Sequence, residues 1–211
     1  MNKRRLEKFK QVVAQRQPDI TVVLENVIDL HNIGAVLRSC DSVGIREIFV
    51  LHTEAGLQAD SITIGKRTAA GARRWVDVHY YTDAAACFQH VRQHYQRILA
   101  THLEREAIEL YDLDLTIPAA FLFGNERDGL SEEVLQYADS NFWIPQMGMS
   151  ESLNISVACA VTLYEALRQR RLQHFYSSNN PLPQTAQQQL LDEYIRRHEE
   201  RDARKVIPVK K

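Results

Sequence analysis

Short apolar runs alternate with longer segments of helical periodicity along most of the chain. The apolar runs predict buried strands at residues 20–24, 45–51, 76–80, 97–101, 119–123 and 141–144. Between them, the spacing of apolar residues predicts helices at 32–43, 82–95, 131–138 and 153–170. Alternation of strands and helices indicates an α/β domain with a mostly parallel sheet.

Polar residues mark the expected starts of these helices. The predicted N-caps are Asn32, Thr82, Ser131 and, for the last helix, Ser150 or Ser152. Gly44 is expected to end the first helix, because glycine readily adopts the left-handed conformation found there.

The pattern changes at both ends of the chain. Residues 1–17 predict a basic helical extension, residues 18–171 form the core domain, and residues 172–211 predict a linker followed by a basic helix. The C-terminal helix is expected at about 184–205, because its apolar side chains fall on one face: Leu190, Leu191, Tyr194, Ile195 and His198.

The formal net charge of −1 argues against a protein that coats nucleic acid indiscriminately. Its distribution is uneven, however. Residues 1–10 and residues 201–211 each hold five basic side chains and one acidic side chain. A polyanion would be bound at these ends, although solvated charged termini are the simpler alternative.

Several classes of protein are excluded or unsupported. No apolar run reaches the length of a membrane span, and no apolar segment follows the basic N-terminus as in a secretory signal. Cys40, Cys87 and Cys159 lie far apart, which favours reduced, buried thiols in a cytoplasmic protein. The histidines show no metal-binding spacing, so no metal is expected. The GxGxxG, GxxxxGK[ST] and GxSxG motifs are absent.

Three polar, glycine-containing segments lie beside predicted strands: HNIGAVLRS (31–39), LFGNERDGLS (122–131) and IPQMGMSESLN (144–154). In parallel sheets, ligands bind at the carboxyl ends of the strands. The residues alone therefore predict a ligand-binding site formed by these segments, without identifying its chemistry.

Two of these segments leave specific alternatives open. Arg38 lies opposite the apolar stripe of its helix, where it either pairs with Asp41 or presents its guanidinium to a phosphate. Gly124 and Gly129 enclose four polar residues, a pattern that indicates a tight loop with some backbone at positive φ.

In this order, the three segments resemble the signature motifs of the SpoU/TrmH family of RNA 2′-O-methyltransferases. The first matches as Asn32-Ile-Gly-Ala-Val-Leu-Arg38, the second as FGNERDGLS (123–131) and the third as IPQMGMSESLNISVACAVTLYEA (144–166). The resemblance spans residues 20–170. It implies a SPOUT-type fold with a C-terminal deep trefoil knot, a homodimer whose active sites are completed near the partner subunit, and S-adenosylmethionine as cofactor.

The resemblance also implies a role for individual residues. The catalytic set would be Arg38, Asn32, Glu126, Ser152 and Asn154. The cofactor would be bound by Thr101, His102, Leu103, Gly124, Asn125, Ile144, Met149, Ser152 and Leu153. The RNA would be bound by Lys3, Arg4, Arg5, Lys8, Arg168, Arg171, Arg201 and Arg204.

The implied substrate is a guanosine ribose in the D-loop of tRNA, at position 18. The basic ends and the phrases RQPDITVVLENV (16–27) and ILATHL (98–103) resemble that branch of the family. Only about 19 residues precede the first strand, so no separate RNA-binding domain is expected there. Three alternatives remain open: methylation of another tRNA or rRNA nucleotide, a non-catalytic RNA-binding module, and a protein that binds a small phosphorylated metabolite.

Overall fold

The computed structural model describes all residues except 66–68, 70, 104–105, 201–205 and 211. Its centre is a seven-stranded sheet with the order β4-β2-β1-β7-β5-β8-β6, in which every pair of neighbouring strands is parallel. The predicted α/β class and parallel sheet are therefore confirmed.

All the predicted strands are present in this sheet: β1 (Ile20–Glu25), β2 (Glu47–Leu51), β4 (Asp77–Tyr81), β5 (Arg97–Thr101), β7 (Ala119–Phe123) and β8 (Ser140–Trp143). The sequence did not indicate β6 (Ile108–Glu109), which is too short to show a period. It also did not indicate β3 (Ser61–Thr63) and β9 (Val206–Pro208), which form a separate antiparallel pair.

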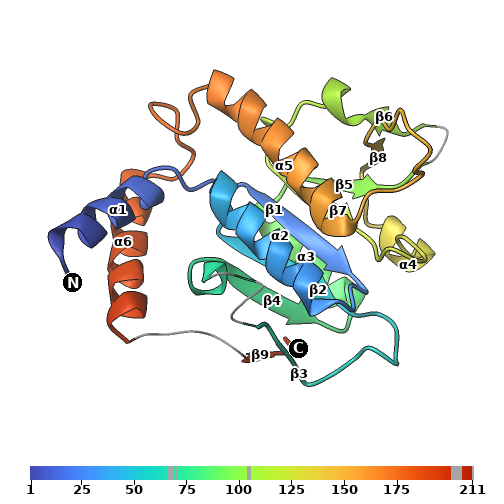
Figure 1. The fold of residues 1–211 in the computed structure, drawn as a ribbon, viewed down its shortest axis with the longest axis horizontal. Coiled ribbons are helices and arrows are strands. Elements are labelled where there is room, and N and C mark those ends of the chain that lie inside the picture. The colour runs from blue at the N-terminus through green and yellow to red at the C-terminus, as the bar shows by residue number, and fades with distance from the viewer. Residues whose placement is uncertain (66–68, 70, 104–105, 201–205, 211) are drawn as a thin grey trace.

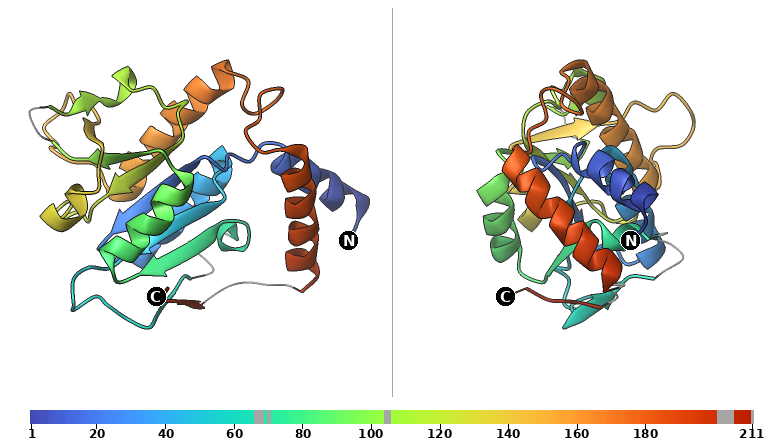
Figure 2. Two further views of the ribbon diagram at one scale, coloured as in Figure 1. Left: turned by 180° about the vertical axis from the view of Figure 1, so that it is seen from behind. Right: turned by 90° about the vertical axis from the view of Figure 1, so that its left-hand side faces the viewer.

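Helices cover both faces of the sheet. α2 (Leu30–Val43) and α5 (Ile155–Leu172) lie side by side on one face, and α3 (Ala84–His94) covers the other (Figures 1 and 2). Side chains alternate along β1, so that Val22 and Leu24 join the core under α2 and α5, whereas Val23 joins the core under α3. Each fully buried side chain of this kind stabilises the fold by roughly 1.5–3 kcal/mol.

Most of the predicted N-caps were wrong. Asp29 caps α2 through His31 N, Asp83 caps α3 through Ala86 N, and Asn154 caps α5 through Ser156 N. The predicted caps were Asn32, Thr82 and Ser150 or Ser152. Each true cap is an Asp or Asn close to the predicted position, and these residues cap as well as Ser or Thr.

Two other predicted helix boundaries are confirmed. Ser131 caps α4 (Glu132–Leu135) by accepting from Val134 N, although that helix ends earlier than residue 138. Gly44 ends α2 with a φ of 94°, and a Cβ atom there would lie 2.6 Å from the carbonyl oxygen of Gln15. The short 3₁₀ helices η1 (Ala72–Arg74) and η2 (Leu110–Asp112) complete the elements of the described chain.

The two terminal helices pack against each other instead of extending into solvent. α1 (Lys3–Val13) and α6 (Gln184–Glu199) share a small core that contains Phe9, Val13, Leu190 and Tyr194. The predicted apolar face of α6 therefore packs as expected. α6 ends at Glu199, and residues 201–205, over which the helix was also predicted, lie outside the described residues.

The described C-terminal residues return to the sheet. β9 pairs with β3, Val209 N donates to the carbonyl of Asp60, and Lys210 N donates to the carbonyl of Tyr80. Backbone hydrogen bonds thus attach this segment to the core, whereas only a linker and a basic helix were predicted for residues 172–211.

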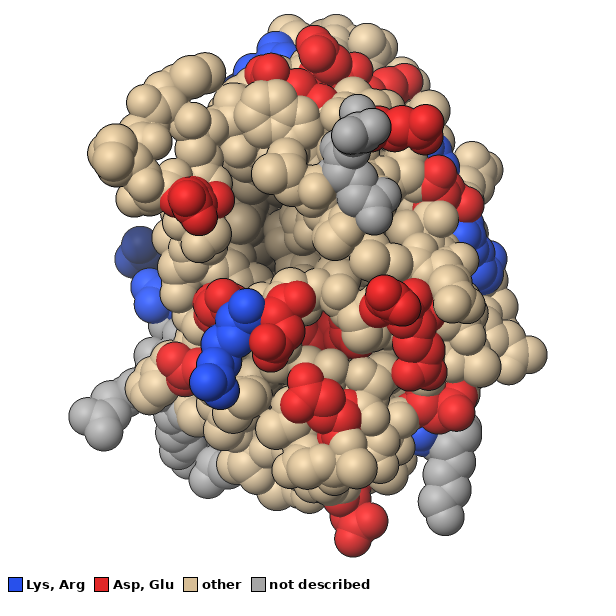
Figure 3. Space-filling model, turned by 90° about the vertical axis from the view of Figure 1, so that its right-hand side faces the viewer, with Lys and Arg blue, Asp and Glu red and all other residues tan. Residues whose placement is uncertain are grey.

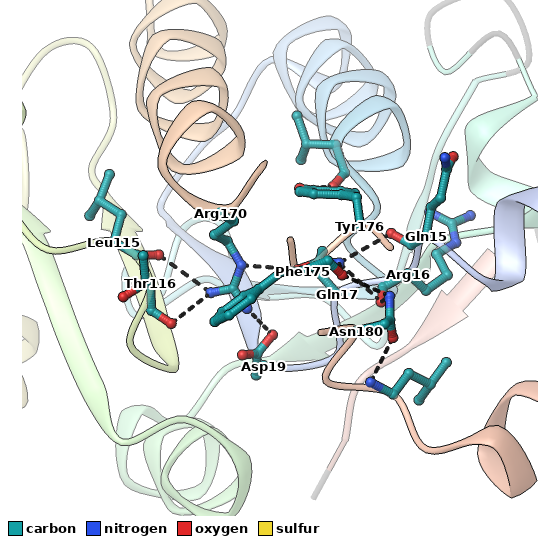
Figure 4. Close-up of polar contacts among 12 residues, drawn as sticks. Gln15, Arg16, Gln17, Asp19, Leu115, Thr116, Arg170, Phe175, Tyr176 and Asn180 are labelled. Carbon is teal, nitrogen blue, oxygen red and sulfur yellow. Dashed lines mark hydrogen bonds and ion pairs between the residues drawn. The ribbon is translucent and has the colours of Figure 1, made fainter. Parts of the chain in front are cut away.

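Buried arginines fix the ends of the chain to the amino-terminal edge of the sheet. Arg170 is fully buried, pairs with Asp19, and donates to Gln17 Oε1 at 3.0 Å (Figure 4). Arg16 is also fully buried and bonds to Asp41 at 2.6 Å and to Tyr194 Oη at 2.9 Å.

Candidate active site

A cavity of about 660 Å³ opens at the carboxyl ends of β5, β7 and β8. It is enclosed by residues of the loops 124–131 and 144–154 and by the first turns of α5. Figure 3 views the molecule from this side and shows the surface hollowed near its centre. The volume falls in the range of roughly 300–1,000 Å³ that is typical of small-molecule sites.

The cavity brings together almost all the residues predicted to bind a cofactor: Thr101, His102, Leu103, Gly124, Asn125, Ile144, Ser152 and Leu153. Met149 is the exception, because its side chain is fully exposed and does not line the cavity. In the first half of this loop the lining residues alternate, with Gln146, Gly148 and Ser150 at the cavity. Met149 therefore falls on the outward-facing positions, as does Met147, which is 94% exposed.

The loop after β7 is held in one tight conformation. A Cβ atom at Gly124 would lie 2.1 Å from the backbone of Gly129, so only glycine fits there. Asn125 and Gly129 exchange two backbone hydrogen bonds of 3.1 Å, and Gly129 has a φ of 71°. The Asn125 side chain also accepts from the N–H groups of Arg127 and Asp128. The predicted tight loop with positive φ is confirmed, and it places Glu126 at the cavity wall.

A chain of side-chain hydrogen bonds joins the three predicted segments. Asn32 Nδ2 donates to Glu126 Oε1, and Asn154 Nδ2 donates to Asn32 Oδ1 at 3.2 Å. The orientation of each amide follows from this network. Ser152, the one serine in the predicted catalytic set, lines the same cavity. Four of the five predicted catalytic residues therefore lie at or beside this site.

Arg38 lies on α2, six residues after Asn32. It is exposed on α2 and does not line the cavity. Within the described ranges it makes no hydrogen bond or ion pair, and Asp41, its alternative partner, is bound to Arg16 instead. The structure thus favours an available guanidinium over a surface ion pair.

The cavity combines apolar and acidic surfaces. Phe123, Phe142 and Ile144 contribute apolar surface, and the carboxylates of Glu126 and Glu151 also line the wall. Figure 3 shows further acidic side chains gathered beside the hollow. Such a site suits a ligand that has an apolar aromatic part and a positive charge.

The predicted RNA-binding residues occupy several places. Lys3, Arg4, Arg5 and Lys8 are exposed on α1. Lys8 and Arg171 line a cleft of about 690 Å³ near the C-terminal ends of α2 and α5, together with His174. Arg168 is exposed and bonds to Glu165 at 2.8 Å. Arg201 and Arg204 lie outside the described residues.

Sequence reasoning missed part of the cavity wall. Trp143, Gln146 and Glu151 line it but were not predicted to bind a ligand. The available signal was position, since each of them lies within two residues of a predicted lining residue. Glu25 was also missed, although an acidic residue at the end of the apolar run ITVVL is unusual in a buried strand.

Three further expectations concern the cysteines, metal ligands and membrane-spanning helices. Cys40, Cys87 and Cys159 are free and buried, which confirms their predicted placement. Across the described residues, no three His, Cys, Asp or Glu side chains gather as ligands for a metal ion. No helix in the described chain combines the length and apolar character needed to cross a bilayer.

Comparison with known proteins places these features in a family. The SpoU rRNA Methylase family matches residues 19–164. The tRNA (guanosine(18)-2′-O)-methyltransferase of Escherichia coli (strain K12) is 37% identical over 194 residues, which cover 92% of this chain and 82% of that protein.

Solved structures agree with this comparison. The TrmH/SpoU tRNA modifying enzyme of A. aeolicus superposes with a TM-score of 0.80 at 31% identity, covering 92% of this chain and 96% of that one. The SpoU methyltransferase AviRb from Streptomyces viridochromogenes, in complex with the cofactor AdoMet, gives a TM-score of 0.63 at 26% identity, covering 74% and 62% of the two chains.

Proposed function

Because this chain belongs to the SpoU rRNA Methylase family, we propose that it transfers the methyl group of S-adenosylmethionine to the ribose 2′-hydroxyl of guanosine 18 in tRNA. The observation that carries the proposal is the hydrogen-bonded chain of Glu126, Asn32 and Asn154 beside the cavity. A site that only binds RNA has no need of three oriented polar side chains next to a small-molecule cavity. The substrate assignment is supported by the activity for which the relative from Escherichia coli is named.

The cavity fits S-adenosylmethionine chemically. Phe123, Phe142 and Leu153 provide apolar surface for the adenine and the carbon chain, and Glu126 and Glu151 provide negative charge for a ligand with a net positive charge. Backbone groups of the loops 124–131 and 144–154 suit the adenine edge, which offers one donor and one acceptor. When bound, this cofactor supplies a methyl group on a sulfonium sulfur. Loss of that methyl group converts the sulfonium into a neutral thioether, which is a good leaving group. For that reason the proposal includes no metal ion.

Arg38 would act on the RNA. Its guanidinium remains protonated at neutral pH, which makes it unsuitable as a simple base. It can instead bind the phosphate next to the target ribose through its planar fork of donors. That contact would orient the ribose and stabilise negative charge that develops on the 2′-oxygen, and the phosphate bound by Arg38 would take up the hydroxyl proton as the methyl group passes from sulfur to oxygen. Asn32 and Asn154, already held in place by hydrogen bonds, would help to fix the same ribose.

The acidic surface beside the cavity repels a polyanion, so affinity for tRNA must come from elsewhere. Lys3, Arg4, Arg5 and Lys8 on α1 and Arg171 at the end of α5 are exposed cations that suit phosphate groups. Contacts of this kind give affinity and salt dependence, not the choice of nucleotide.

We also propose that the active enzyme is a homodimer in which Arg38 serves the cavity of the partner subunit. Arg38 does not line the cavity of its own chain. Nearby on α5, Val157 and Tyr164 are 46% and 51% exposed, which leaves apolar surface for a partner. If Arg38 acts on the partner, mixing an Arg38→Ala chain with a Glu126→Ala chain would restore activity to one site of each mixed dimer.

The deep trefoil knot expected of a SPOUT-type fold remains part of the proposal. The strand order is compatible with a knot, because the later strands are inserted between earlier ones. β7 lies between β1 and β5, and β8 lies between β5 and β6, although β7 and β8 follow all three of these strands in the sequence. We place the protein in the cytoplasm, since its three cysteines are free thiols and its proposed substrate is tRNA.

The proposed function is tested by methyl transfer from labelled S-adenosylmethionine to an unmodified tRNA transcript. Label is expected on guanosine 18, and a matched transcript with 2′-deoxyguanosine at that position should remain unlabelled. Label on another nucleotide, or on ribosomal RNA, would retain the enzyme class and change the substrate. A folded protein that labels no RNA would contradict the proposal and favour the binding-module alternative.

A further inference from the structure

A buried carboxylate lies beneath the candidate active site. Glu25, the last residue of β1, is fully buried. It makes no ion pair within the described ranges. Burial of a carboxylate is unfavourable unless hydrogen bonds replace its lost hydration. The donors that do so therefore show what this residue holds in place.

Two of these donors belong to Ser131. Its backbone N–H donates to Glu25 Oε2 at 2.9 Å, and its hydroxyl donates to Oε1 at 2.5 Å. The same hydroxyl oxygen accepts from Val134 N and caps α4. Since the hydroxyl has a single proton, its bond to Glu25 leaves the oxygen lone pairs free to cap the helix.

Ser131 ends the loop that carries Glu126. Asn125 and Gly129 close this loop on itself, so its internal shape is fixed and its placement depends on its two ends. One end continues from β7, and the other is fixed at Ser131 by Glu25. The position of Glu126, and thus its bond with Asn32, depends on both ends.

The carboxylate also contacts the chain on the opposite side. Thr53, just after β2, donates its hydroxyl to Glu25 Oε1 at 3.1 Å. Asn26, with a φ of 51°, bonds through its side chain to Thr53 at 2.9 Å. Asn26 begins the segment that leads into α2 and Asn32. Glu25 therefore joins the ends of β1 and β2 to the loop after β7.

We propose that Glu25 is a positioning residue for methyl transfer, whose carboxylate fixes the loop 124–131 so that Glu126 meets Asn32 at the cavity. The inference rests on the proposed function for its kinetic test. Displacements of about 1 Å at a reacting site can reduce a rate on the order of a hundredfold. The residue would act through Glu126 and have no contact with the substrate.

The kinetic test uses Glu25→Gln, which keeps the size of the side chain but places an amide donor against the Ser131 donors. We expect kcat to fall about tenfold or more, with the KM for tRNA changed less than about threefold. Glu47→Gln is the matched control, because Glu47 also accepts from a hydroxyl, that of Tyr95, but at the amino end of β2. Its kcat should equal that of the native enzyme.

A double variant separates positioning from general destabilisation. If Glu25 acts through Glu126, Glu25→Gln should cause no further loss of kcat in a Glu126→Ala background. Multiplicative losses in the double variant would overturn the inference, as would a native kcat in folded Glu25→Gln. If Glu25→Gln fails to fold, Ser131→Ala removes the hydroxyl donor to Glu25 together with the cap of α4, keeps the backbone N–H donor, and should lower kcat in the same direction.

Hydrogen exchange provides a test that needs no activity. In Glu25→Gln, backbone amides of residues 125–131 should exchange about tenfold faster than in the native protein, while amides in the middle of α5 remain unchanged. Unchanged exchange in that loop would overturn the inference. If the native protein transfers no methyl group, the proposed function fails, and the exchange experiment still decides whether Glu25 holds the loop.

Discussion

The two edges of the parallel sheet bury polar groups in opposite ways. At the amino edge, the fully buried guanidinium groups of Arg16 and Arg170 each pair with an aspartate. At the carboxyl edge, the buried carboxylate of Glu25 is bound by neutral donors. The guanidinium of Arg38, on α2, is exposed and makes no hydrogen bond or ion pair with the described residues.

The difference distinguishes charged groups that stabilise the fold from charged groups that remain available to a ligand. A buried guanidinium with a hydrogen bond at each of its three nitrogens, such as that of Arg170, has little left to offer a ligand. Neutral donors such as those of Ser131 orient a loop without adding a positive charge beside the cavity. The carboxyl edge can therefore receive a charged cofactor and RNA, whereas the amino edge holds the terminal segments to the core.

The largest expected effect is on stability at the amino edge. Arg170→Ala leaves Asp19 and two carbonyl groups without their buried partner, which should lower the free energy of unfolding by roughly 3–5 kcal/mol. Urea denaturation would measure this loss, with Arg168→Ala as the control, because Arg168 is 61% exposed and should matter little. The distinction between the edges breaks down if Arg170→Ala is as stable as the native protein.

Arg38→Ala should have the converse effect. Since this side chain is exposed and unpaired within the described residues, the free energy of unfolding should change by less than about 0.5 kcal/mol. Methyl transfer should fall on the order of 10²–10³-fold, or about 3–4 kcal/mol of transition-state stabilisation. Steady-state rates on the tRNA transcript would measure it.

The variant Arg38→Lys sharpens this test. Lysine keeps the charge but lacks the planar fork of donors, so it should recover only part of the rate. Full recovery would show that Arg38 contributes charge alone, and a native rate in Arg38→Ala would remove it from the catalytic set.

Much of the fold could be predicted because buried parallel strands are marked by apolar runs. β1 and β7 were found within one residue of their observed ends for this reason. β6, β3 and β9 are too short to carry a period, and their pairing depends on distant parts of the chain. The end of α6 and the return of the C-terminus to β3 depend on such tertiary pairing as well.

The candidate site could be located from sequence, but its internal contacts could not. Glycine and polar residues after apolar strands indicated where the cavity walls lie. The bond between Asn32 and Glu126 joins residues 94 positions apart, so no local pattern predicts it. That bond also explains the misplaced cap: the side chain of Asn32 is engaged with Glu126, and Asp29 caps α2 instead.

Within the carboxyl edge, Asn32 and Asn154 should differ in a smaller, measurable way. Asn32→Ala removes the side-chain hydrogen bonds to Glu126 and Asn154 and should slow methyl transfer about 10–100-fold without changing the free energy of unfolding. Asn154→Ala should slow transfer similarly and also lower the free energy of unfolding by about 1 kcal/mol, because Asn154 caps α5. Thermal unfolding and rates of both variants would be compared. Equal stabilities would contradict the division of roles.

The smallest expected effect returns to the amino edge, at Glu47. Burial alone would raise the pKa of its carboxyl group, but the hydrogen bonds and charge of His79 and the hydrogen bond from Tyr95 outweigh burial and lower that pKa from 4.5 to about 2. A carboxyl group with a lowered pKa stabilises the folded state at pH values above its unfolded pKa. That stabilisation is lost as the pH falls from about 4.5 towards 2.

Glu47→Gln should therefore flatten the pH dependence of unfolding in this window, by about 1 kcal/mol between pH 5 and 3. Urea denaturation at several pH values would measure it. Tyr95→Phe, which removes one donor to the carboxylate, should raise the Glu47 pKa and move the loss of stability to higher pH. Parallel pH profiles for native protein and Glu47→Gln would show that this carboxylate does not titrate with folding, and the charged amino edge would then owe its stability to the buried arginine pairs alone.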